Sequence, residues 1–220
     1  MCGHYRGTSG KEYLLPDLRV CDCQLDARVS ELQLVQAVVA TVSRSPHVGD
    51  SDPAPVPGRS CGSCSLCCKL CAVIQLNKPA GQWCPHASPG SGCKIHDRRP
   101  QACREFCCVW LLDPALGPEW KPEVARFVLS ANIRAFTVVV DPGMPLAWKR
   151  APYYSRLKRL SERLFAENKR VVVDLKGQIT VVLPDRDVPL GVIPPGAEIV
   201  VWREGSSYGA KLQAARTTQP

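Results

Sequence analysis

Cys61-Gly-Ser-Cys64-Ser-Leu-Cys67-Cys68-Lys-Leu-Cys71 opens the stretch that organises this chain. The stretch ends at Cys108 and holds ten of the thirteen cysteines. It contains few large apolar side chains, so a hydrophobic core cannot account for its folding. Cysteines at this density indicate that metal ions or disulfide bonds supply the missing stability.

The cysteine count and the expected compartment separate these two alternatives. The count is odd, and residues 1–30 lack the charged and then apolar pattern of a secretory signal. We therefore expect a cytoplasmic protein, in which thiols stay reduced unless a metal holds them. No stretch approaches the roughly 18–20 uninterrupted apolar residues of a membrane span, so we expect no membrane partner. The sequence thus favours metal over disulfides.

The charge balance gives weak information about partners. With 28 Lys and Arg against 20 Asp and Glu, the formal net charge is +8. Metal binding requires deprotonated thiols and would remove part of this excess. Charge by itself is therefore poor support for a nucleic-acid partner, which we do not expect, and it leaves a protein partner open.

Composition divides the chain into four parts. A run rich in proline precedes the cysteine stretch, and apolar, β-branched segments follow it. The fold class that this order predicts is α+β: a loop-rich, metal-stabilised cysteine cluster joined to a small, mostly antiparallel α+β unit. The four predicted parts are a poorly ordered extension and Pro-rich linker at 1–57, a metal-binding region at 58–112, an α+β region at 113–205 that is separate from it or continuous with it, and a flexible tail at 206–220.

Apolar periodicity predicts the secondary structure. Helical spacing of apolar residues predicts helices at 30–43 and 152–168, the second with Tyr153, Leu157, Leu160 and Leu164 as its buried stripe. A third helix is expected to run from Pro100 to Leu112, with Cys103 and Cys107 on one face. Strands are expected at 126–130, 135–140, 171–175, 178–183 and 197–202, the third and fourth forming a hairpin.

The spacing of the first cysteines is compatible with iron or with zinc. Cys61-x2-Cys64-x2-Cys67-x3-Cys71 coincides with the bacterial ferredoxin run, although Ala72 replaces the proline that follows it there. Close thiolates on a tight loop suit an iron–sulfur cluster. Zinc would instead use four of the sulfurs in a tetrahedron.

Zinc could also use three sulfurs and one imidazole, for which His86 and His96 are the candidates. The neighbours Cys67 and Cys68 would rarely reach the same metal. One of the two therefore serves a second site, a second metal of a cluster, or none. Cations could offset thiolate charge near such a centre, and the basic residues closest in sequence are Lys69, Lys94, Arg98, Arg99 and Arg104.

The order of these motifs resembles the YkgJ-type family of cysteine-cluster proteins. The resemblance covers about residues 59–112: a CxxCxxCC run, a tryptophan-flanked cysteine before His86, Gly92-Cys93 with Ile95-His96, and Arg99-Pro100 before the last cysteines. It implies chelation of zinc or iron, without an established reaction for most members. The matching positions, which the resemblance implies as metal ligands, are Cys61, Cys64, Cys67, Cys68, Cys84, Cys93, Cys103 and Cys108. Cys71 and Cys107 fall at positions that the family pattern leaves open and, with the two histidines, are secondary candidates.

Two alternatives come from other functional classes. The cysteine cluster is similar to that of flagellin lysine methylases, which suggests an iron–sulfur-dependent protein-modifying enzyme, although no Gly-rich nucleotide-binding loop follows a strand. A zinc-stabilised module could instead bind nucleic acid or an acidic protein through the basic segment at 149–170. A solvated helix face is the simpler interpretation of that segment. Whether the chain is an enzyme stays open, and no catalytic residue is assigned.

Overall fold

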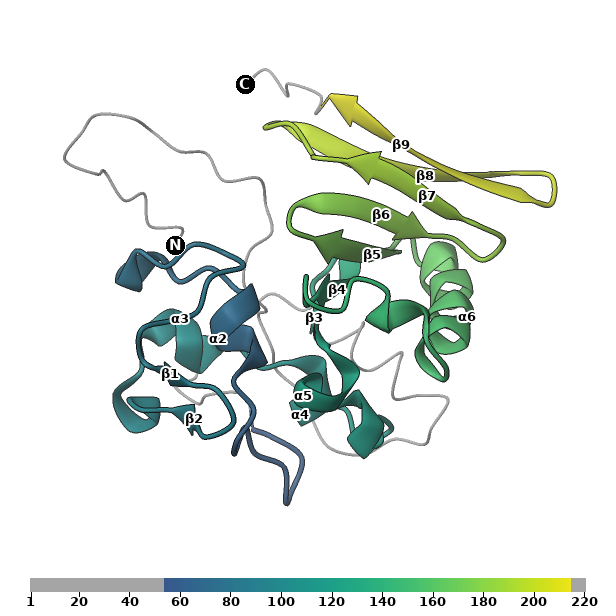
Figure 1. Cartoon of the computed structure of the whole chain (residues 1–220). Coiled ribbons are helices and arrows are strands. Elements are labelled where there is room, and N and C mark those ends of the chain that lie inside the picture. The colour runs from purple at the N-terminus through teal and green to yellow at the C-terminus, as the bar shows by residue number, and fades with distance from the viewer. Residues whose placement is uncertain (1–53, 215–220) are drawn as a thin grey trace.

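The computed structural model describes residues 54–214. In Figure 1 the cysteine region lies on one side of the molecule and a sheet with one long helix on the other. Helices and mixed sheets occur together, which confirms the predicted α+β class. The helix expected at 30–43 lies outside the described residues, as do residues 1–53 of the expected N-terminal extension.

The cysteine region is built from very short elements joined by turns. This is the expected outcome for a segment rich in Pro, Gly and Ser, whose turns replace regular structure. In chain order the elements are α2 (Leu66–Leu70), η1 (Ile74–Leu76), β1 (Ala87–Ser88), β2 (Gly92–Cys93), η2 (His96–Arg98), α3 (Gln101–Glu105) and α4 (Val109–Leu112).

The helix expected from Pro100 to Leu112 is two helices, and this corrects the prediction. Helix α3 ends at Glu105, and Phe106 and Cys108 have extended backbones with ψ of 112° and 146°. Cys103 and Cys107 therefore do not share a face of one helix. The break lets Cys107, Cys108 and all of α4 become buried, so tertiary packing overrides the local helical pattern.

The second half forms a five-stranded sheet in the order β3-β4-β5-β6-β7. Three of its four pairings are antiparallel, and only β4 and β5 run parallel. A parallel pair needs a crossover connection, which α6 provides. The elements are η3 (Pro118–Trp120), α5 (Pro122–Ala125), β3 (Phe127–Ala131), β4 (Ala135–Val140), η4 (Ala147–Lys149), α6 (Tyr153–Ala166), β5 (Arg170–Leu175), β6 (Gln178–Val182) and β7 (Asp187–Gly191).

The strongest periodic signals in this half predicted the right elements. Helix α6 buries the expected stripe of Tyr153, Leu157, Leu160 and Leu164. The hairpin of β5 and β6 turns at Lys176-Gly177, where both residues have positive φ, as the short turn requires. Strands β3 and β4 also form where they were expected, within one residue at each end.

In this half the prediction missed strand β7 and mistook the segment of another strand for a flexible tail. Strand β7 contains Pro189 and half-buried residues, so its pattern is weak. The expected last strand extends to β8 (Ala197–Glu204) and pairs with β9 (Ser207–Ala214), so the part of the predicted flexible tail up to Ala214 is a strand. A small second core of Val181, Leu183 and Ala210 joins this hairpin to the sheet.

The main core is continuous between the two halves. It includes Leu66 and Leu70 of α2, the whole of α4, and the inner faces of the sheet and α6. Within the second half this core contains edge-to-face rings of Trp120, Phe127 and Tyr153, with centroids 4.9 to 6.0 Å apart. Within residues 54–214, no helix is both long and apolar enough to cross a membrane.

Candidate metal centre

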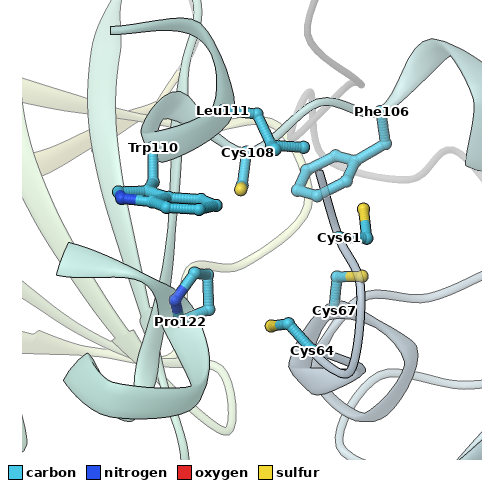
Figure 2. A pocket seen from close by; sticks show the side chains of 8 residues that line it. All are labelled: Cys61, Cys64, Cys67, Phe106, Cys108, Trp110, Leu111 and Pro122. Atoms are coloured by element: carbon cyan, nitrogen blue, oxygen red, sulfur yellow. The ribbon is translucent and has the colours of Figure 1, made fainter. Parts of the chain in front are cut away.

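Four cysteines line one small cavity between α4 and the loop at 61–65, which we call the first cysteine loop, with the start of α2 that follows it. They are Cys61, Cys64, Cys67 and Cys108, which we call the cavity set. The cavity has a volume of about 30 Å³ and is otherwise bordered by apolar side chains. Those side chains are Phe106, Trp110, Leu111 and Pro122. Figure 2 shows the four cysteine side chains around the cavity.

Local backbone geometry positions the four cysteines of the cavity set around the cavity. The N–H of Cys64 donates to the carbonyl of Cys61 at 2.8 Å, which closes a turn through Gly62 at a φ of +51°. Helix α2 follows at once and carries Cys67. On the opposite side, the extended backbone at Cys108 begins α4, and Leu111 donates to the carbonyl of Cys108 at 2.9 Å.

Arg59 connects the start of the first cysteine loop to the segment around α4, a role that the sequence did not predict. Its guanidinium donates to the carbonyls of Asp113 and Leu116, each at 2.6 Å, and to that of Trp110. It also lies 5.0 Å from the centre of the Trp110 ring. The planar fork of arginine suits several acceptors at once. No local sequence signal predicts this role, because all of its partners are more than fifty residues away.

A second group of four cysteines lies outside the cavity. Its members are Cys68, Cys84, Cys93 and Cys103, which we call the hairpin set because β1 and β2 connect two of them. The N–H of Cys84 donates to the carbonyl of Cys68 at 3.0 Å, and Cys93 is paired across the hairpin with Ala87. The thiol of Cys103 lies within electrostatic range of the other three.

The hairpin of β1 and β2 packs closely against the first cysteine loop. Gly92, next to Cys93, has a φ of +96°, and a Cβ at this position would lie 2.5 Å from the carbonyl oxygen of Gly62. Only glycine avoids both the strained backbone and the collision. This approach gives a physical reason for the Gly92-Cys93 pair.

Burial and one thiol–thiol hydrogen bond raise the pKa values of the cavity set. It raises the pKa of Cys61 and of Cys64, and it raises that of Cys108 to about 12. The thiol of Cys67 donates a hydrogen bond to Cys68; this raises the pKa of Cys67 and lowers that of Cys68 to about 7. Any metal must therefore displace protons from the cavity set.

Three cations interact electrostatically with the thiols, and only Arg99 was expected from the sequence. Lys121 acts on Cys61 and Cys64, and Arg99 acts on Cys61 and Cys103. The Lys78 side chain belongs to a residue only 5% exposed. Its ammonium donates to the carbonyls of Lys69 and Cys71 and is acted on by the thiols of Cys71, Cys68, Cys84 and Cys67.

Of the other cations proposed from the sequence, Lys69 and Arg104 have different partners. Lys69 forms an ion pair with Asp141, and the guanidinium of Arg104 donates to the carbonyl of Arg99 at 2.9 Å. Lys94 and Arg98 are exposed. Arg99 and the two lysines that sequence proximity missed are therefore the cations that face the thiols.

The secondary candidates lie apart from the cavity. Cys71 and Cys107 do not line it, although Cys107 is buried and Cys71 lies near Lys78. The exposed His96 ring faces the Arg99 guanidinium, with nitrogen separations of 3.0 and 3.2 Å. The carbonyl of His86 accepts from the N–H of Lys94 at 2.9 Å, which holds the hairpin.

The donor atoms fit a thiophilic metal, but they are not gathered at one point. Among the cysteines of residues 54–214, all ten lie outside disulfide bonds. Over the same residues, no group of three or more His, Cys, Asp or Glu side chains is disposed to hold a metal ion. Four thiols around one apolar cavity are nevertheless the donor set that zinc and iron prefer, and binding would require these thiols to draw together.

Comparisons with family models, with curated proteins and with solved structures give no match for this chain.

Proposed function

We propose that this chain is a metal-binding protein that holds zinc or iron through the thiolates of its cysteine region. The observation that carries the proposal is the convergence of Cys61, Cys64, Cys67 and Cys108 on one apolar cavity. Three of these thiols come from a single loop and helix, and the fourth comes from the far end of the cysteine region. Sulfur-only ligand sets are typical of structural zinc sites and of iron.

The size of the cavity favours a single ion over an iron–sulfur cube. A space of about 30 Å³ has room for one or two waters. Four irons and four sulfides would require the loop to open much further than one ion requires. The cavity is also far below the roughly 300–1,000 Å³ of ordinary ligand pockets, so it cannot take a nucleoside-sized methyl donor. The methylase-like alternative therefore has no support in this cavity.

The nucleic-acid alternative also has little support. Lys149 and Lys158 both pair with Asp187, at 3.1 and 2.8 Å, and Arg156 lies 3.7 Å from the carboxylate of Glu119. These cations of the basic segment are partly neutralised within the chain. A solvated helix face accounts for the segment.

The test is the metal and acid-labile sulfide content of the full chain purified without oxygen, together with its visible spectrum. We expect zinc or iron close to a whole number per chain, without sulfide. Iron with equal sulfide would replace the single ion by a cluster. If the protein carries no metal and takes up neither Zn²⁺ nor Fe²⁺ under reducing conditions, the proposed function is wrong.

A further inference from the structure

The vicinal pair Cys67 and Cys68 marks a boundary between two groups of thiols. Both residues lie within α2, where consecutive side chains point about 100° apart. Cys67 lines the apolar cavity, whereas Cys68 does not. The two sulfurs are hydrogen-bonded neighbours, and only that of Cys67 lines the cavity.

The four cysteines of the hairpin set lie near one another. The backbone hydrogen bond from Cys84 to Cys68 fixes two of them side by side, and the Ala87–Cys93 pairing of β1 and β2 brings a third back towards Cys84. Cys103 is placed by the first turn of α3, where its N–H donates to the carbonyl of Pro100 at 2.9 Å. One sulfur thus comes from each of four separate segments.

Cations lie beside both groups, and Arg99 acts on one thiol of each. Lys121, next to Pro122 at the cavity, acts on Cys61 and Cys64 and pairs with Glu123 at 2.6 Å.

The buried Lys78 acts on Cys67 and on three thiols outside the cavity, those of Cys71, Cys68 and Cys84. The Lys78 ammonium donates to the carbonyls of Lys69 and Cys71, which carry no net charge. Burying an ammonium is costly unless a negative charge compensates it. A divalent ion bound by four thiolates carries a net charge of about −2 and would compensate Lys78.

We propose that the cavity set and the hairpin set are two separate metal centres, each closed by four thiolates, so that the chain binds two metal ions. This inference rests on the proposed function and assigns all eight cysteines. Cys71 and Cys107 belong to neither centre. The centres adjoin at Cys67 and Cys68, and the Gly92–Gly62 approach holds the hairpin beside the first loop.

The experiment counts zinc in the full chain, reconstituted with Zn²⁺ under anaerobic reducing conditions and freed of excess ion. We expect two zinc ions per chain in the wild type. Cys64→Ser should keep one ion through the hairpin set, and Cys93→Ser should keep one through the cavity set. Cys71→Ser, the same chemical change in the same region, should keep both.

A titration of the wild type with Co²⁺ gives the number of sites without any variant that might misfold. Its thiolate-to-cobalt absorption should rise to a break at two equivalents. A break at one equivalent would overturn the inference and leave the proposed function intact. Loss of both ions in each of Cys64→Ser and Cys93→Ser, with the Cys71→Ser control unchanged, would show one binuclear cluster and would also overturn it. If the wild type binds no ion, the proposed function itself fails.

Discussion

The ammonium of Lys69 lies 2.7 Å from Oδ1 of Asp141, and this ion pair joins the cysteine region to the sheet. Lys69 directly follows the Cys67-Cys68 pair on α2, and Asp141 directly follows β4. The carboxylate is fully buried and also accepts from Arg126 and from the N–H of Gly143 at 3.0 Å. The orientation of α2, and with it the direction of its two thiols, therefore depends on a carboxylate far away in the sequence.

Replacing that carboxylate should destabilise the protein. In Asp141→Asn the buried side chain loses its negative charge, while Lys69 and Arg126 keep their positive charges. We expect a loss of about 2–4 kcal/mol in the free energy of unfolding. Denaturant unfolding measures this loss. Asp97→Asn is the control, since that side chain is fully exposed, and it should unfold like the wild type. Equal stability of all three proteins would show that the buried pair contributes nothing.

The same ion pair predicts a pH dependence. Burial alone would raise the pKa of Asp141, but the hydrogen bonds from Lys69 and Gly143 and the charges of Lys69 and Arg126 outweigh it and lower the pKa. A lowered pKa in the folded state contributes stability that is present above the ordinary value of 3.8 and is lost as the pH falls through the folded-state pKa. The stability difference between wild type and Asp141→Asn should therefore shrink below about pH 4. A difference that stays constant from pH 7 to pH 3 would contradict this.

Gly92→Ala tests the contact between the hairpin and the first cysteine loop. The new methyl group would collide with the carbonyl of Gly62 on a backbone with positive φ. We expect a loss of about 2–4 kcal/mol, from backbone strain of about 1 kcal/mol and overpacking of about 1–3 kcal/mol.

Gly90→Ala is the matched control for that variant. Gly90 also has a positive φ, of +79°, but nothing lies within 4 Å of a Cβ there. It should lose only the strain contribution of about 1 kcal/mol in the same unfolding experiment. If the two variants lose equal stability, the close approach is not a structural requirement.

Lys78→Met tests the buried cation beside the hairpin set. The substitution keeps most of the side-chain volume and removes the charge that acts on Cys68 and Cys84. We expect the affinity of one of the two zinc ions to fall about tenfold, as for other groups that support metal ligands. Competition with a chromophoric chelator measures this affinity. Lys94→Met, at an exposed position of the same region, should bind both ions like the wild type.

If the chain binds metal as proposed, removing the metal should loosen the cysteine region and spare the sheet. Most of the main core comes from side chains of the sheet and α6, whereas α2 contributes only Leu66 and Leu70. Of the eight candidate ligands only Cys108 is a buried member of this core, and Cys61, Cys64 and Cys67 pack against it. After chelation, hydrogen exchange should accelerate across 61–108 and stay slow in β4 and β5. Fast exchange throughout the chain would show that the metal holds the whole fold.

Local patterns predicted the elements whose packing is strongest. The apolar stripe of α6 and the alternation of β5 and β6 are strong because each buries one face on the core. The same reasoning failed at 100–112, where nothing in the local sequence breaks a helix but burial of Cys107 and Cys108 does. It also missed β9, which gains its stability from pairing with β8 and from contact with the small second core.

The sequence by itself determined which residues are the candidate ligands and that the second half is α+β, because cysteine spacing and apolar periodicity are local properties. Only the tertiary structure decided how the eight cysteines divide, which cations face them, and which carboxylate orients α2. Those relationships join residues such as Cys67 and Cys108, or Lys69 and Asp141, that no local pattern connects. They arise when the two halves bury a common core, and that packing brings distant side chains to the same place.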